Sequence, residues 1–133
     1  MLGEKQIAWL GKALDASAGA AKPAIIVAHH NPPQAKYGNH PGGITDWEAL
    51  SDVILPRKQV KALIFGHTHD WTSEQLEGVH LVNLPPTAYV FAAGRPNGWV
   101  DAYVREDGIT LQLHALDETH PEHGQKLDLK WRG

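Results

Sequence analysis

The 133-residue sequence predicts an α/β protein with a mixed sheet, flanking helices and a C-terminal antiparallel hairpin. In the first half, short apolar runs alternate with amphipathic helical segments, which is the pattern of parallel strands joined by helical crossovers. In the second half, alternating apolar and polar residues are separated by turn signals, as in antiparallel hairpins. The length suits one domain, residues 1–133, with a single core.

The chain begins with an amphipathic helix followed by a strand. Residues 4–18 carry Ile7, Leu10 and Leu14 at the three-and-four spacing that lines one helical face. The run AIIVA at 24–28 is short, apolar and rich in β-branched residues. Such a run is typical of a strand that is buried on both faces, as in a parallel sheet.

A loop, a second helix and a second strand come next. Prolines and glycines in residues 31–43 exclude a regular element there. Residues 46–55 predict a helix with Asp46 as its N-cap and Pro56 just beyond its end. The apolar run VKALIF at 60–65 predicts a second buried strand, which completes a strand, helix, strand unit.

The second half predicts antiparallel structure. Residues 73–84 and 99–116 each read as a hairpin, and residues 127–131 as one last short strand after a polar loop. In the second hairpin the REDG segment supplies the turn. Three of its residues alternate with outward residues and are expected to face the core: Val100, Ala102 and Val104.

Composition narrows the function classes. The formal net charge of −3 offers no basic field for phosphate backbones, so we expect no nucleic-acid partner. No apolar run reaches membrane-spanning length and no signal-peptide pattern is present, so we expect a cytoplasmic protein without membrane contact. Cysteine is absent, which excludes disulfides and thiolate metal sites. Nine histidines remain, and histidine is the commonest metal ligand.

Two of these histidines follow the second buried strand, in the stretch FGHTHDW. In an extended chain alternate side chains point the same way, so His67 and His69 are expected to project into one space. Gly66 is expected to allow a sharp turn and a close approach. Two convergent imidazoles are most simply held together by a metal ion. Asp70 is a candidate acceptor for a ligating imidazole, and Trp71 a candidate wall of a substrate pocket.

The first buried strand ends in a similar way, in the stretch VAHHNPP. Consecutive residues on a strand face opposite sides, so only one of His29 and His30 is expected to join His67 and His69. The double proline stiffens the chain directly after this point. The remaining histidines at 80, 114, 120 and 123 are expected to pack or to face solvent.

The segments VAHHNPP and FGHTH, with LVNLPPTAYVF after them, resemble the last motifs of the calcineurin-like metallophosphoesterases. The resemblance covers nearly the whole chain and corresponds to the C-terminal half of that family. It implies part of a four-layer sandwich. It also implies a dinuclear site of Fe, Mn or Zn, in which hydroxide and an aspartate bridge the two ions.

The resemblance also implies roles for individual residues. Gly66 to His69 match the G-H-x-H motif, which makes His67 and His69 ligands of different ions. His30 matches H-x-P-P most directly and becomes the third metal ligand, beside His67. The stretch HHNPP is one residue longer than H-x-P-P. If the inserted residue follows the double histidine, His29 takes the ligand role; otherwise His29 is left as a substitute proton donor.

The family's N-terminal motifs are missing. The sequence contains neither D-x-H nor G-D-x-x-D. The stretch YGNHP at 37–41 contains G-N-H, but it follows the His30 strand and has no acidic residue after it. We therefore expect no metal role for Asn39 and His40. Without carboxylates to offset the charge of two cations, at most one ion is expected here.

These observations predict a metal-dependent hydrolase of small phosphoesters, or an incomplete fragment of one with little activity alone. Two alternatives stay open. In the first alternative the chain is an inactive metal-binding module. In the second it self-associates through an open sheet edge, as a homo-oligomer or a strand-exchanged dimer.

Overall fold

The computed structural model describes residues 1–33 and 42–133. The elements in chain order are α1 (Glu4–Gly19), β1 (Ala24–Val27), α2 (Trp47–Ile54), β2 (Val60–Phe65), β3 (Thr72–Leu76), β4 (Val79–Asn83), β5 (Gly98–Val104), β6 (Gly108–Ala115) and β7 (Lys126–Lys130). Each helix and strand expected from the sequence is present, with bounds that shift by a residue or two. The YGNHP stretch lies outside the described residues.

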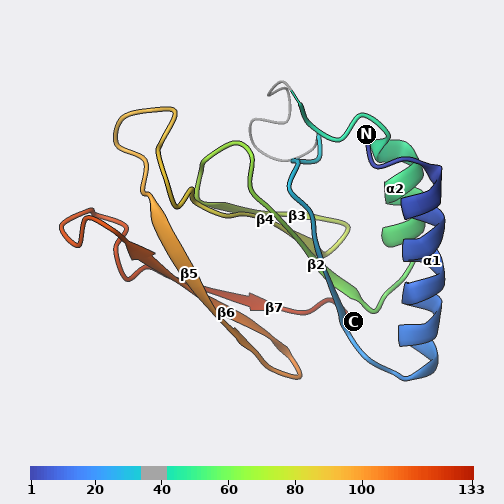
Figure 1. Cartoon of the computed structure of the whole chain (residues 1–133). Coiled ribbons are helices and arrows are strands. Elements are labelled where there is room, and N and C mark those ends of the chain that lie inside the picture. Colours follow the sequence, from blue (N-terminus) through green and yellow to red (C-terminus); the bar gives the residue numbers. More distant parts are fainter. Residues whose placement is uncertain (34–41) are drawn as a thin grey trace.

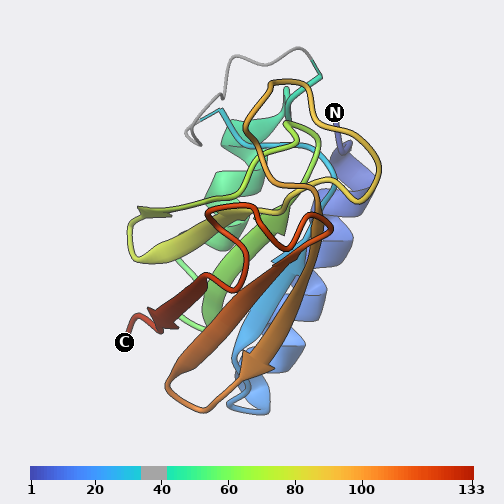
Figure 2. The same ribbon diagram turned by 90° about the vertical axis from the view of Figure 1, so that its left-hand side faces the viewer.

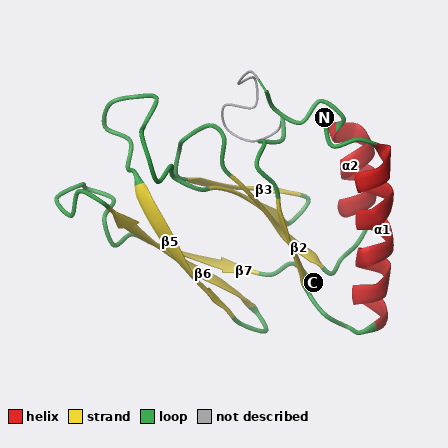
Figure 3. Ribbon diagram, in the orientation of Figure 1, coloured by secondary structure: helices red, strands yellow, loops and turns green. Residues whose placement is uncertain are grey.

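The elements form three layers (Figures 1 and 3). A four-stranded sheet has the order β1-β2-β4-β3, in which β1, β2 and β4 are parallel and β3 runs antiparallel to β4. Both helices cover one face of this sheet. Its other face packs against an antiparallel sheet of order β5-β6-β7, which stands in front in Figure 2. The mixed sheet with flanking helices is therefore confirmed.

Two apolar clusters hold the layers together. The first lies between the helices and the four-stranded sheet and includes Leu14, Leu50, Leu63 and Phe65. The second lies between the two sheets and includes Val82, Trp71, Ile109, Leu111 and Leu113. Because β2 and β4 are central strands covered on both faces, their sequences are almost continuously apolar.

The start of α2 differs from the prediction. Asp46 is the residue before the helix, but its side chain makes no capping hydrogen bond to α2. Its carboxylate instead accepts hydrogen bonds from the backbone N–H groups of Gly3 (2.7 Å) and Leu2 (2.9 Å). These bonds lower the pKa of the Asp46 carboxyl. The residue therefore joins the beginning of α1 to the beginning of α2.

The two hairpins confirm the predicted pairing. Glu77 and Gly78 connect β3 to β4 with φ angles of 49° and 80°, as in the two-residue I′ turn that suits a twisted hairpin. In β5, Val100 is half-buried against the second cluster, but Ala102 and Val104 are exposed. That part of the prediction is wrong because β5 is an edge strand, and past Val100 it leaves the core.

The segment after β7 returns to the amino end of β2. The Arg132 guanidinium donates hydrogen bonds to the carbonyls of Arg57 (2.8 Å), Val60 (3.0 Å) and Glu77 (3.0 Å). One side chain thus joins the turn before β2 to the turn between β3 and β4 at this end of the sheet. Among the described residues, no helix is long and apolar enough to cross a membrane.

Candidate metal centre

Three histidines meet at the carboxyl ends of β1 and β2. These strand ends lie at the upper edge of the sheet in Figure 1. Backbone hydrogen bonds extend the parallel pairing past the strand ends, from Ala28 N–H to the Ile64 carbonyl (3.0 Å) and from Gly66 N–H to the His29 carbonyl (3.1 Å). The chain segments that follow both strands are therefore held side by side. This is the edge where open α/β sheets place their sites.

The three histidines are His29, His30 and His67. One ring nitrogen from each lies within 4.8 Å of the other two. The ring centroids are 4.9 to 5.3 Å apart. The expectation that only one of the two consecutive histidines reaches this space is wrong. Side chains alternate only within a strand, and β1 already ends at Val27.

His67 stands at the centre of a tight turn. Its φ is 65°, and Thr68 N–H donates to the Gly66 carbonyl at 2.7 Å, which together describe a γ-turn. Gly66 does not have the expected role. It has no positive φ, and a Cβ added there would meet no atom of the described chain within 4 Å. The unusual backbone belongs to the histidines themselves, since His69 also has a positive φ of 52°.

His69 lies apart from the three-histidine cluster. Its ring stacks flat on Phe91, with centroids 3.9 Å apart and planes 4° from parallel, and Tyr89 meets it edge-on at 5.0 Å. The two positive φ angles remove the extended geometry that would have aimed His67 and His69 in one direction. The Nδ1 atom of His69 is buried and has no hydrogen-bond partner in the described part of the chain.

The other candidates near the site have structural partners. The Asp70 carboxylate pairs with Arg95 and accepts a hydrogen bond from its neighbour's backbone N–H, so an arginine takes the place of the expected imidazole. Trp71 is buried in the cluster between the sheets, and its indole N–H donates a hydrogen bond to Gln125 Oε1. Asn83 at the end of β4 donates to Thr68 Oγ1, which fixes the loop that carries the histidines.

Gly42 is a site residue that the sequence analysis did not single out. Its φ is 89°, and a Cβ added there would lie 2.9 Å from Nε2 of His67 and 3.9 Å from His30 Cδ2. The backbone of Gly42 therefore packs directly against the imidazole cluster. A side chain at this position would push on the Nε2 atom of His67.

The cluster suits a divalent metal ion. Two nitrogens bound to one zinc ion at about 2.1 Å can be at most about 4.2 Å apart. Because the observed separations are no larger than 4.8 Å, small ring rotations bring all three nitrogens to one ion. Burial and the neighbouring His67 and His29 lower the pKa of His30, which favours the neutral imidazole that metals require.

Carboxylates are missing from this cluster. In residues 1–33 and 42–133, the only group of three or more metal-ligating side chains consists of these imidazoles, with no Asp or Glu among them. Neutral imidazoles do not reduce the repulsion between two cations. The described residues therefore fit one divalent ion and do not by themselves fit two.

Comparisons with known proteins agree with this fold. The family model described as calcineurin-like phosphoesterase matches residues 3–71. A relative from Pseudomonas aeruginosa, named 3′,5′-cyclic adenosine monophosphate phosphodiesterase CpdA, is 30% identical over 100 residues, which are 75% of this chain and 36% of that protein. A probable cyclic nucleotide phosphodiesterase of Psychrobacter sp. (strain PRwf-1) is 30% identical over 115 residues, 86% of this chain and 33% of its own length.

Among solved structures, a dimetal phosphatase from Danio rerio superposes with a TM-score of 0.74 at 20% identity, covering 98% of this chain and 38% of that protein. This likeness confirms the metallophosphoesterase fold. The chain spans about a third of the length of the curated relatives it matches. Because the family model matches just over half of the residues, this chain belongs to the calcineurin-like phosphoesterase family.

Proposed function

We propose that this chain provides the histidine side of a divalent-metal site for the hydrolysis of small phosphoesters. The observation that carries the proposal is the approach of three imidazole nitrogens to within 4.8 Å at the carboxyl edge of a parallel sheet. Family membership supports the reaction class. A bound divalent ion would polarise the phosphoryl group and lower the pKa of a bound water.

The residues divide into two roles. His30 and His67 hold the ion, and His29 completes its ligand set when a single ion is bound. In a two-ion site His69 is the ligand of the second ion, for which its buried and unpartnered Nδ1 is suited. His29 is then released to give a proton to the leaving alkoxide. We expect the metal to be Zn, Mn or Fe.

The hydrolysis rate should depend on carboxylates from outside the described residues, because they would allow a second ion to bind. With imidazoles alone, one ion binds and a phosphoester is held, but no second ion positions the attacking water. We therefore propose that this chain alone hydrolyses phosphoesters slowly, as an incomplete part of a longer catalytic unit. The names of the relatives point to small phosphodiesters such as cyclic nucleotides as the substrate class.

Zinc binding tests the proposal. Native mass spectrometry of the wild-type chain should show one zinc ion, and His30→Ala and His67→Ala should each abolish it. His29→Ala should weaken binding more than His69→Ala, because only His29 belongs to the cluster. His123→Ala is the matched control, since this exposed histidine lies in the segment before β7. A wild-type chain without zinc, or a His67→Ala variant that keeps it, would refute the proposal.

The rate of phosphoester hydrolysis shows whether the metal site of this chain is complete. Bis(4-nitrophenyl) phosphate should be hydrolysed slowly or not at all by the zinc-loaded chain. Fast turnover that His67→Ala abolishes would show that the chain supplies its own carboxylates, and the claim of an incomplete site would be wrong.

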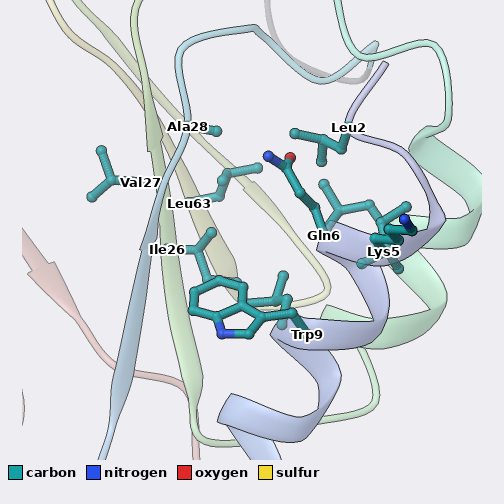
Figure 4. A pocket seen from close by; sticks show the side chains of 11 residues that line it. Leu2, Lys5, Gln6, Trp9, Ile26, Val27, Ala28 and Leu63 are labelled. Atoms are coloured by element: carbon teal, nitrogen blue, oxygen red, sulfur yellow. The ribbon is translucent and has the colours of Figure 1, made fainter.

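A second candidate function is self-association through β1. Among the described residues β1 pairs only with β2, so its outer edge is open, and Val27 there is 74% exposed. A cavity of about 520 Å³ lies beside this edge (Figure 4) and is lined by Leu2, Trp9, Ile26, Val27 and Leu63 among others. Two identical edges can pair antiparallel about a two-fold axis, with the apolar linings facing each other.

Light scattering with size-exclusion chromatography tests this second candidate. The wild-type chain should then run as a dimer, and Val27→Lys should convert it to a monomer because a charged lysine on the open edge disfavours edge pairing. Val104→Lys is the control, since this residue is exposed on β5, an edge strand of the other sheet. A monomeric wild type would exclude the function.

A further inference from the structure

Two exposed aromatic side chains contact His69, which follows the candidate ligand His67 by two residues. They lie on the loop between β4 and β5, where Tyr89 is 62% exposed and Phe91 is 55% exposed. Their rings also contact each other, with centroids 5.7 Å apart and planes at 69°. Single exposed aromatic residues are common on proteins, but two in contact next to a site form a surface on which another ring can stack.

His69 connects this aromatic pair to the metal centre. Its ring stacks on Phe91 at 3.9 Å and meets Tyr89 at 5.0 Å, while its backbone is two residues from His67. Two residues span at most about 7 Å. The aromatic pair is therefore attached, through His69, to a backbone position within about 7 Å of the Cα of His67.

We infer that Tyr89 and Phe91 form a stacking platform for an aromatic ring attached to the substrate phosphate, which selects nucleoside phosphates over sugar phosphates. The inference rests on the proposed phosphoester function and adds the residues that would recognise the base of a nucleotide substrate. Stacking on aromatic side chains recognises any base through its flat face. A sugar phosphate has no such ring and gains nothing from the platform.

The first experiment needs no metal. Adenosine and ribose are titrated separately into the chain, and the ring resonances of the aromatic residues are followed by NMR. Adenosine should shift the resonances of Tyr89 and Phe91, and ribose at the same concentration should not. If neither compound shifts them, or both do so equally, the platform does not exist. Because no phosphate or zinc takes part, this result is independent of the proposed function.

The second experiment measures selectivity in the zinc-loaded chain. AMP should bind about tenfold more tightly than ribose 5-phosphate. The double variant Tyr89→Leu/Phe91→Leu should bring the two affinities close together by weakening AMP alone. Tyr103→Leu is the control, because this tyrosine is exposed to a similar extent, 59%, but lies on β5 away from His69.

The same variants distinguish a platform from a support for His69. If the double variant weakens zinc binding while the tenfold preference for AMP persists, the rings only orient the histidine and the inference is overturned. If the wild-type chain binds no zinc and no phosphate but adenosine still shifts the two rings, the proposed function fails while the platform remains.

Discussion

His67 combines a ligand position with a strained backbone. A non-glycine residue in a γ-turn with positive φ is rare, and such conformations raise the free energy of the folded state by about 1–3 kcal/mol. The surrounding structure holds it in place through the paired backbone of Gly66 and His29 and through the Thr68 contact with Asn83. The strain therefore coincides with the residue that the proposed function depends on most.

Replacing His67 by glycine or by alanine should separate strain from function. Both variants lose the imidazole and should lose zinc binding, but His67→Gly should be about 1 kcal/mol more stable than His67→Ala because glycine accepts positive φ. Urea unfolding of the two variants measures the difference. Equal stabilities would mean that the turn relaxes when the ring is removed.

Gly42 should matter for metal binding although it ligates nothing. In Gly42→Ala the new methyl group would meet His67 Nε2 at 2.9 Å, so we expect zinc affinity to fall by about tenfold or more. Gly124→Ala is the matched control, because Gly124 also has a positive φ (78°) but a Cβ there meets nothing within 4 Å. Isothermal titration with zinc compares them. Equal affinities in both variants would contradict a direct contact.

At the scale of elements, Asp46 joins the starts of α1 and α2 in a pH-dependent way. N–H donation from Gly3 and Leu2 lowers the pKa of its carboxyl below the ordinary 3.8. The folded state thus favours the charged form, so the contribution to stability is complete above pH 3.8 and is lost as the pH falls through the lowered value.

The variant Asp46→Asn should therefore be less stable than the wild type at neutral pH. The difference in the free energy of unfolding should shrink below pH 3.8, where the wild-type carboxyl becomes protonated as well. Urea unfolding at several pH values gives this difference directly. A difference that stays constant across the range would show that charge plays no part.

The elements themselves were predictable because their signals are local. Apolar runs identified β1 and β2, and the spacing of Ile7, Leu10 and Leu14 identified α1. The directions of the histidines were not predictable in the same way. They depend on loop dihedral angles, such as the positive φ of His67, and strand alternation says nothing about residues beyond the end of a strand.

The remaining site residues were missed for a similar reason. The prolines and glycines around Gly42 predict a loop but not what the loop contacts. The contact of Gly42 with His67 joins segments that are 25 positions apart in the sequence. Tyr89 and Phe91 belong to the stretch LVNLPPTAYVF, which resembles the family but does not by itself predict a role for either ring. Their placement after a buried strand and a double proline was the one signal that pointed to an exposed loop near the site.

At the scale of the whole molecule, the histidines and Arg132 occupy opposite ends of the four-stranded sheet. The histidines follow the carboxyl ends of β1 and β2, whereas Arg132 binds carbonyls around the amino end of β2. This one guanidinium joins two turns, the one before β2 and the one between β3 and β4. Substitutions at the Arg132 end of the sheet should therefore change stability, and substitutions at the histidine end should change metal binding.

The substitution Arg132→Leu should test this separation. Removing donors from partly buried carbonyls should lower the free energy of unfolding by about 2–4 kcal/mol, while zinc affinity stays within about twofold of the wild type. Arg105→Leu is the control, because the ion pairs of this arginine are exposed to solvent, which screens them, and should contribute little to stability. A matching loss of zinc affinity in Arg132→Leu would show that the two ends are coupled.

The I′ turn at Glu77 and Gly78 has a consequence for the order of folding. The turn joins β3 and β4 within twelve residues, whereas β1 and β2 pair across an intervening helix and a long loop. Local hairpins form in microseconds, and distant parallel pairings must first close a large loop. We therefore expect the β3–β4 hairpin to form early in folding and the segment that carries His29 and His30 to pair with β2 later. The proposed metal site would then be complete only after the rest of the sheet has formed.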